Sequence, residues 1–154
     1  MNGEEKLNEF LQRADEWLSL QNLPAINVNP NIEQTLNLSQ VELQSLSAED
    51  CLAMGYELYA YSEFLQHCLS KEKIILDWAD GSIWYIISDK LNQYGDKFTK
   101  WQEKYYSAIK ENPLASQILK IKNNATCRVT LLDGKSEKII KMANMLETLS
   151  KRRR

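Results

Sequence analysis

Apolar side chains recur along most of this chain every three, four or seven residues, which is the spacing of one face of an α-helix. The longest such pattern runs from Ser47 to Tyr94. Ser47 and Asp50 are spaced as a helix-capping pair, and no proline interrupts the segment. We expect a long central helix with a bend or a close backbone contact at Gly81, because glycine weakens a helix. The predicted buried stripe comprises Leu58, Tyr61, Leu65, Cys68, Ile75, Ala79, Ile83, Ile86 and Leu91.

Several large side chains of the central segment, including Tyr56 and Tyr85, fall outside that stripe. A single neighbouring helix would leave such rings exposed, and an exposed apolar area of this size is typical of an interface. We therefore expect self-association. The predicted oligomer interface comprises Tyr59, Phe64, Trp78, Trp84, Ile118, Leu132, Ile139 and Leu146.

A shorter helical pattern and an irregular segment precede the central helix. Residues 4–21 have the periodicity of an amphipathic helix. Residues 22–46 lose it and contain Pro24 and Pro30, each of which disfavours helix in the residue before it. We expect a linker or an extended arm there. The apolar residues of this arm, which could lie along a neighbouring surface, are Ile26, Val28, Ile32, Leu36 and Leu38.

Two lysine-rich helices are expected after a chain reversal at Gly95. The first spans about residues 96–111. The second spans about residues 113–150, and Asn112 and Pro113 form the cap and first turn expected of a new helix. Its weak point is Gly134. The predicted inward side chains of the first helix are Phe98, Trp101, Tyr105, Ala108 and Ile109, and one heptad position of the second is occupied by Ile118, Ala125, Leu132, Ile139 and Leu146.

Together these patterns predict an all-α fold. The seven-residue repeat is typical of a coiled-coil-like helix, which packs either against the central helix of its own chain or across a subunit interface. The expected architecture is an oligomer whose long helices form an antiparallel helical hairpin or a coiled-coil-like bundle. We divide the chain into residues 1–46, an acidic N-terminal helix plus an Asn/Pro-rich linker arm, and residues 47–154, a long-helix domain for oligomerisation and nucleic-acid binding.

Composition places the chain among ordinary soluble proteins. Its 154 residues are 44% hydrophobic and 26% charged, and five glycines and three prolines are few enough to favour helices. Acidic side chains interrupt the first twenty residues, and no apolar run approaches membrane length. We therefore expect a cytoplasmic protein with no membrane contact.

The net charge of −2 hides a division between the two halves of the chain. Residues 1–50 carry two basic and nine acidic side chains, a net charge of −7, whereas residues 95–154 carry fourteen basic and six acidic side chains, a net charge of +8. This asymmetry indicates a polyanionic partner for the basic half. It is equally compatible with pairing of acidic and basic faces between subunits.

Basic residues combined with aromatic residues are the main functional signal. Single-stranded nucleic acid is held by cations that follow its phosphates and by rings on which its bases stack. The alternative interpretation is that the lysines form a solvated helix face and the rings fill the core; the four cations from Lys151 onward could likewise be a solvated tail. The candidate nucleic-acid-binding residues are Lys97, Lys100, Lys104, Lys110, Lys120, Lys122, Arg128, Lys135, Arg152, Arg153 and Arg154.

Catalytic chemistry has little support in the sequence. The only histidine, His67, adjoins Cys68, and neighbours on a helix point about 100° apart, so they do not form a nucleophile and base pair. No nucleotide-binding, metalloprotease or hydrolase motif occurs. Cys51, Cys68 and Cys127 are isolated from one another, which favours reduced, buried thiols. We expect a protein that is not an enzyme and that has no metal site and no cofactor.

Part of the chain resembles a family of bacteriophage proteins. The resemblance lies in the run from Tyr56 to Leu65, in Lys71 and Lys73, and in the pattern of the last long helix, and it covers about residues 47–150. That last pattern consists of Asn112, Pro113, Leu114, Ala125, Arg128, Leu132 and Leu146. On these residues the chain resembles the UvsY-like recombination mediators. The resemblance implies a helical, ring-shaped oligomer in the cytoplasm of a bacterial host cell. Such an oligomer would bind single-stranded DNA and load a RecA-like recombinase over single-strand-binding protein.

The chain also departs from that family. A basic Lys-x-Arg pair that the family uses for DNA falls here on Ile87 and Asp89, so no DNA contact carries over residue by residue. The acidic residues 1–46 have no counterpart, and we assign them to a protein partner or to covering the basic surface of a neighbouring subunit. Two alternative functions are a helical phage scaffold or packaging protein, and a regulator that binds another protein through this acidic arm.

Overall fold

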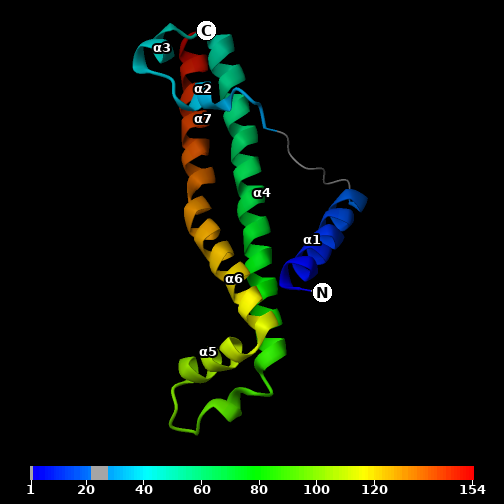
Figure 1. Ribbon diagram of the computed structural model, residues 1–154. Coiled ribbons are helices and arrows are strands. Elements are labelled where there is room, and N and C mark those ends of the chain that lie inside the picture. Colours follow the sequence, from blue (N-terminus) through cyan, green and yellow to red (C-terminus); the bar gives the residue numbers. More distant parts are fainter. Residues whose placement is uncertain (1, 22–27) are drawn as a thin grey trace. The chain divides into compact units, whose positions relative to one another are not determined.

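All regular elements in the described residues, 2–21 and 28–154, are helical in the computed structural model of the protein (Figure 1). The all-α prediction is therefore confirmed. None of the helices in this part of the chain combines the length and apolar character that crossing a bilayer requires. The elements are α1 (Gly3–Leu20), α2 (Ile32–Leu36), α3 (Gln40–Ser45), α4 (Ala48–Ile87), the 3-10 turn η1 (Leu91–Tyr94), α5 (Trp101–Glu111), α6 (Pro113–Leu132) and α7 (Lys135–Arg152).

Side-chain caps set where the longer helices begin. In α1 the side chain of Asn2 accepts a hydrogen bond from the amide of Glu5 (2.8 Å), and the Glu5 carboxylate accepts one from the amide of Asn2. The hydroxyl of Ser47 accepts from the amide of Asp50 (3.1 Å) and starts α4, as its sequence predicts. Asn112 accepts from the amide of Ala115 (3.0 Å) and starts α6.

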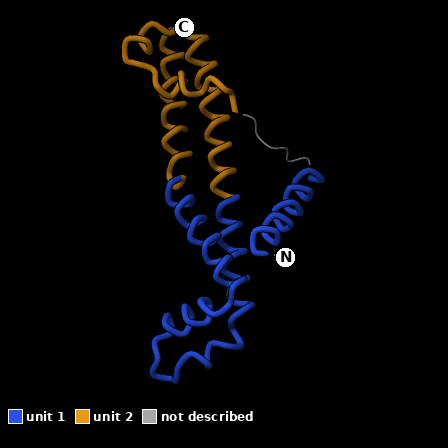
Figure 2. The backbone as a smooth tube through the Cα atoms, in the orientation of Figure 1, with its two compact units in different colours: residues 1–24, 71–131 blue, residues 25–70, 132–154 orange. Residues whose placement is uncertain are grey.

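The chain forms two compact units, to both of which α4 contributes (Figure 2). Unit 1 consists of residues 1–24 and 71–131, and unit 2 of residues 25–70 and 132–154. Each unit therefore combines segments that lie far apart in the sequence.

The core of unit 1 joins α4, α5 and α6. Burial of aliphatic side chains at every third or fourth position of α4 matches the predicted stripe, since Ala79 and Ile83 are fully covered. α1 is held at its start, where the amide of Gly3 donates to Gln117 Oε1 (2.9 Å). A Cβ at Gly3 would lie 3.3 Å from side-chain carbons of Gln117 and Ile118, so the close approach favours glycine. The buried core residues are Ala79, Ile83, Ile87, Tyr105, Ala108, Ile109, Ala115 and Ile118.

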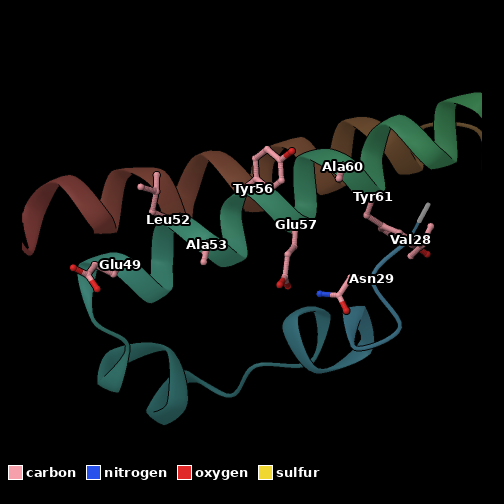
Figure 3. A pocket seen from close by; sticks show the side chains of 9 residues that line it. All are labelled: Val28, Asn29, Glu49, Leu52, Ala53, Tyr56, Glu57, Ala60 and Tyr61. Carbon is pink, nitrogen blue, oxygen red and sulfur yellow. The ribbon is translucent and has the colours of Figure 1, made fainter. Parts of the chain in front are cut away.

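The core of unit 2 joins α2, α4 and α7. Gly55 lies close to the backbone of Ala143, and the hydroxyl of Ser136 donates to the carbonyl of Ser62 (3.1 Å). The outer face of α4 in this unit borders a hollow of about 820 Å³ (Figure 3). The buried core residues are Ile32, Cys51, Leu58, Ala143 and Leu146.

Three expectations about the helices are wrong. α4 continues through Gly81, which has no neighbour close enough to explain a glycine. The lysine-rich helix begins at Trp101 rather than near residue 96, because a side-chain turn occupies the preceding residues. The last long helix divides at Gly134, where a φ of +75° leaves helical geometry.

The expected arm is also more ordered than its sequence suggests. Residues 32–45 contain α2 and α3, and Ile32 is buried in the core of unit 2. Both helices are shorter than two turns, so they are too short to produce a visible period. Ser39 caps α3 by accepting from the amide of Glu42 (3.2 Å), which is the one sequence signal that could have found it. Ile26 lies outside the described residues.

Candidate nucleic-acid interface

A tight turn in unit 1 presents the first residues of the candidate interface. The carboxylate of Asp96 accepts from the amide of Phe98 (2.8 Å), and the hydroxyl of Thr99 accepts from the amide of Asp96 (3.1 Å). A side chain at Gly95 would overlap Thr99, so only glycine fits there. The turn therefore fixes the backbone that carries Lys97 and Phe98.

Aromatic rings pack together where α5 follows this turn. The ring centre of Trp101 lies 5.4 Å from that of Trp84 and 5.1 Å from that of Tyr105, with which it is stacked. Tyr105 is buried and also meets Tyr106 edge to face at 5.2 Å. The buried rings hold Trp101 in place while 53% of it remains exposed, together with 82% of Phe98 and 56% of Tyr106. The prediction that Phe98 and Trp101 face inward is wrong.

One lysine lies against an exposed ring, and two more follow it in the sequence, before and within the first turn of α5. The ammonium of Lys97 lies 5.1 Å from the ring centre of Phe98, a cation–π distance. Lys97, Lys100 and Lys104 form no ion pair with another described residue, and the first two are exposed. We call Lys97, Phe98, Lys100, Trp101 and Lys104 the aromatic–lysine surface.

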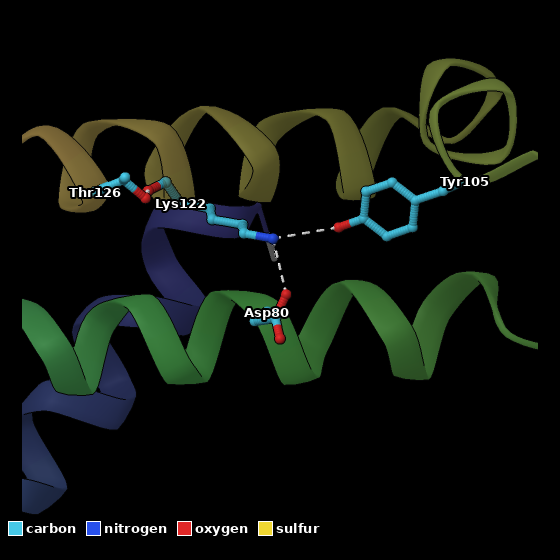
Figure 4. A network of polar contacts seen from close by, with 4 residues as sticks. All are labelled: Asp80, Tyr105, Lys122 and Thr126. Atoms are coloured by element: carbon cyan, nitrogen blue, oxygen red, sulfur yellow. Dashed lines mark hydrogen bonds and ion pairs between the residues drawn. The ribbon is translucent and has the colours of Figure 1, made fainter. Parts of the chain in front are cut away.

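The ammonium of Lys122 is bound by two side chains of the protein itself. Its ammonium donates to Asp80 Oδ1 (2.8 Å) on α4 and lies 3.5 Å from the hydroxyl of Tyr105 on α5 (Figure 4). Burial lowers the pKa of Lys122, but the hydrogen bond to Asp80 and the neighbouring groups outweigh it, so the pKa is raised overall. Lys122 therefore links three helices of unit 1, and its assignment to nucleic acid stays a prediction.

Two arginines of the predicted interface also have partners within the protein. Arg128 Nη1 lies 3.5 Å from Glu72 Oε2, although the Arg128 side chain remains 55% exposed. Arg153 donates to the carbonyls of Leu43 (3.1 Å) and Leu46, and it approaches the Cys51 sulfur. Arg153 thus holds the end of α3 in unit 2, and its role as a phosphate ligand stays a prediction.

The remaining candidate cations divide between the two units. Lys110 and Lys120 are exposed on α5 and α6 of unit 1. Lys135, Arg152 and Arg154 are exposed in unit 2, on or just after α7. Among these candidate cations, Lys97 and Lys122 lie against aromatic rings, and of those two rings only that of Phe98, beside Lys97, is exposed.

Most of the predicted oligomer-interface residues have partners within the chain. Ile118 and Leu146 are buried in the two cores, so neither offers surface to a second copy in this conformation. The Tyr59 hydroxyl donates to Asn144 and Glu147, and burial with these Glu147 contacts raises the pKa of Tyr59. The others are half-buried: Phe64 against Tyr61, Trp78 against Phe10, Trp84 in the aromatic cluster, Ile139 against the core of unit 2, and Leu132 near the end of α6.

The described residues contain neither a disulfide nor a group of side chains that could hold a metal ion. All three cysteines are free there; Cys51 is buried, Cys68 is half-buried, and Cys127 is exposed, contrary to the expectation of a buried thiol. The described residues contain no group of three His, Cys, Asp or Glu side chains that could hold a metal ion.

The sequence does not show that the ring of Trp101 is exposed. Periodicity shows which residues share a helix face, but it does not show that a helix starts only at Trp101 and so leaves that ring half open. The turn signature Gly-Asp-x-x-Thr was readable and could have placed the helix start. No protein-family model, curated protein or solved structure matches this chain.

Proposed function

We propose that this chain is a non-enzymatic, DNA-binding protein that holds single-stranded DNA on the aromatic–lysine surface of unit 1. The observation that carries the proposal is the half-exposed, stacked ring of Trp101 beside lysines that have no carboxylate partner among the described residues. A ring fixed by buried neighbours loses little entropy when a base stacks on it. Base stacking on such a ring contributes about 1–3 kcal/mol.

The same geometry favours single strands over duplex DNA. Bases expose their flat faces only when they are unpaired, whereas lysines attract the phosphates of either form. The turn that fixes Lys97 and Phe98 supplies a cation and a second exposed ring within a few residues of Trp101. Binding is therefore expected to be tolerant of base sequence.

The wider role that we propose is that of a recombination mediator. Copies of the chain, built from long helices in an antiparallel hairpin or coiled-coil-like arrangement, assemble into an oligomer. Several weak strand sites in one oligomer then bind a long strand by avidity. By analogy with the UvsY-like proteins, the oligomer loads a RecA-like recombinase onto strands coated by single-strand-binding protein; this step is supported by that resemblance alone.

Replacing Trp101 tests the strand site. Trp101→Ala should weaken binding of a short oligonucleotide roughly 5- to 150-fold, the equivalent of about 1–3 kcal/mol. Trp17→Ala is the matched control, because Trp17 is exposed to a similar extent (58% against 53%) but lies on the acidic helix α1. A strand short enough for one copy keeps self-association out of the measurement. Equal losses in both variants, or none in either, would contradict the proposed site.

Competing strands test the preference, and a filament assay tests the mediator role. Unlabelled single strands should displace a labelled oligonucleotide more efficiently than a duplex of the same length. The wild-type chain should shorten the lag with which a recombinase forms filaments on strands covered by single-strand-binding protein, and Trp101→Ala should not. If duplex competes equally and the lag is unchanged, a scaffold or packaging role replaces the mediator.

A further inference from the structure

The outer face of α4 in unit 2 carries an exposed strip with helical spacing. Glu49, Ala53, Tyr56, Ala60 and Glu63 follow one another at steps of four, three, four and three, which keeps them on one face. Tyr56 is 75% exposed, and both glutamates are exposed. The strip is a helix face with an aromatic centre, small residues on both sides of it and a carboxylate at each end. We call it the acidic strip.

A hollow gives the acidic strip the form of a groove. Four of the five strip residues, all except Glu63, border a space of about 820 Å³, with Val28 and Asn29 on its far wall (Figure 3). Glu57 points into this space and accepts a hydrogen bond from the hydroxyl of Thr35 (3.2 Å). Residues 25–70, which make up this side of unit 2, contain six carboxylates and no lysine or arginine. The groove thus favours an apolar occupant that carries positive charge.

Helix α1 has a strip of the complementary kind. Lys6, Phe10, Arg13, Trp17 and Leu20 follow one another at the same steps of four, three, four and three. All five are exposed, including 58% of Trp17 and 79% of Leu20. We call this face the basic strip.

The charge of the basic strip is opposite to that of the helix around it. α1 carries five carboxylates, and all of them lie off this face, whereas its two cations, Lys6 and Arg13, both lie on it. Arg13 is paired along the helix with Glu9 (2.7 Å) but keeps 72% of its side chain exposed. The guanidinium is therefore accessible to a second partner.

A different face of α1 is already occupied in its own chain. The amide of Gly3 is bound to Gln117. Phe10 lies at the edge of the basic strip beside this docked face: its ring is 6.2 Å from that of Trp78, and 36% of Phe10 stays exposed. Gly3, Leu7, Ala14 and Leu18 are the positions of that docked face by helical spacing, and each is buried or half-buried. α1 can thus remain on unit 1 of its chain while its basic strip contacts another molecule.

We propose that the basic strip of one copy packs in the groove along the acidic strip of a second copy. The steps of the two strips coincide when the helices are parallel and are offset by one residue at alternate positions when they are antiparallel. In both directions Lys6 meets one glutamate, Arg13 meets the ring of Tyr56, and Phe10 and Trp17 meet the two alanines. Leu20, at the end of α1, then lies beside the other glutamate. Large rings over small residues allow close helix packing, and a guanidinium over a tyrosine ring is a favourable cation–π pair. The proposal rests on the self-association included in the proposed function.

The self-association can be tested by replacing an exposed ring near the centre of each strip and measuring the mass of the protein in solution. Trp17→Ser and Tyr56→Ser should each weaken self-association at least about 30-fold, as loss of a central interface anchor does. Tyr85→Ser is the matched control, because it removes a ring that is 88% exposed and lies outside both strips. Mass is measured by analytical ultracentrifugation without DNA, and circular dichroism confirms the helices. A monomeric wild-type chain, or unchanged mass in both strip variants, overturns the proposal, whereas a failure of strand binding leaves these masses unaffected.

Mixing the two variants shows whether the contact joins different copies. The Tyr56→Ser chain keeps an intact basic strip, and the Trp17→Ser chain keeps an intact acidic strip. An equimolar mixture should therefore form a complex of higher mass that neither variant forms alone. If the mixture stays at the mass of its components, the strip contact between copies is excluded.

Charge exchange then gives the direction of the helices. Lys6→Glu should weaken association, and a second change in the same chain should restore it. Restoration by Glu63→Lys assigns opposite directions to α1 and α4, and restoration by Glu49→Lys assigns the same direction. If neither second change restores association, the proposed pairing of Lys6 with a glutamate of the acidic strip is wrong.

Discussion

Two exposed apolar surfaces, one in each unit, differ in the sign of the charges around them. In unit 1, Phe98 and Trp101 lie among lysines; in unit 2, Leu52 and Tyr56 lie between glutamates. If only exposed rings counted, both surfaces would be expected to bind any apolar partner. The surrounding charge distinguishes them, because cations select a polyanion such as DNA and carboxylates select a cationic helix.

Each unit has a half-buried cation, and the two cations have different partners. In unit 1, Lys122 is paired with the carboxylate of Asp80, a charged side chain. In unit 2, Arg153 is held by backbone carbonyls of Leu43 and Leu46 and keeps its charge without a carboxylate. The pairing of Lys122 therefore depends on the protonation of Lys122 itself, whose pKa is raised, whereas Arg153 clamps the loop before α4 through backbone carbonyls.

Reversing charge on the unit 1 surface should have the largest effect. Lys97→Glu with Lys100→Glu removes two phosphate contacts, and we expect roughly 50-fold weaker binding of a short single strand at low salt. The slope of log K against log salt should become shallower by about 1.4, which is about 0.7 for each lost contact. Fluorescence anisotropy across a salt series measures both quantities.

The matched control for that prediction lies in unit 2. Lys138→Glu with Lys141→Glu reverses two exposed lysines of α7, so the net charge changes equally. If strand binding depends on the aromatic–lysine surface, this control should lose much less affinity and keep its salt slope. Equal losses would show that overall charge governs binding.

Removing the arginine clamp should cost stability rather than affinity. Arg153→Ala leaves the carbonyls of Leu43 and Leu46 without their charged donor, and we expect the free energy of unfolding to fall by about 1.5–2 kcal/mol. Arg152→Ala is the control, since Arg152 is exposed next to it and should change stability by less than about 0.5 kcal/mol. Urea unfolding followed by circular dichroism measures both. If both variants lose the same stability, the clamp has no special role.

The sequence predicts the long helices well and the short ones poorly. Ser47 and Asn112 cap helices where the sequence predicts, because caps act locally. Gly134 is expected from the sequence only as a weak point of one helix, and it separates α6 from α7. α2 and α3 depend on packing of Ile32 and neighbouring side chains against α4 and α7, which no local pattern contains.

The candidate site is less predictable than the helices for the same reason. A tail of cations looks identical whether it is solvated or bound, and only the fold shows that Arg153 reaches carbonyls more than one hundred residues away. Likewise, Lys122 and Lys120 are indistinguishable in the sequence. Their different roles follow from the Asp80 carboxylate that tertiary packing brings to one of them.

The pH response of Lys122 should be the smallest effect. Its pKa in the folded protein lies above the ordinary lysine value of 10.5, so folding favours the protonated form. The stabilisation is fully present below that ordinary value and is lost as the pH rises through the raised pKa. The wild-type chain should therefore lose more stability over this alkaline range than Lys122→Met, by less than about 1 kcal/mol because the pair is partly exposed.

Subtracting the two alkaline stability curves isolates this lysine from the other titrating groups. Tyr94, whose pKa is raised by its hydrogen bond to Glu111, and Tyr59 destabilise both proteins equally as they ionise. Lys120→Met on the same helix should follow the wild-type curve, because Lys120 is exposed and forms no ion pair with a described residue. Urea midpoints at neutral and alkaline pH give the comparison. If Lys122→Met also follows the wild-type curve, the contact with Asp80 does not hold the proton, and the contrast between the carboxylate-paired lysine and the carbonyl-bound arginine no longer applies.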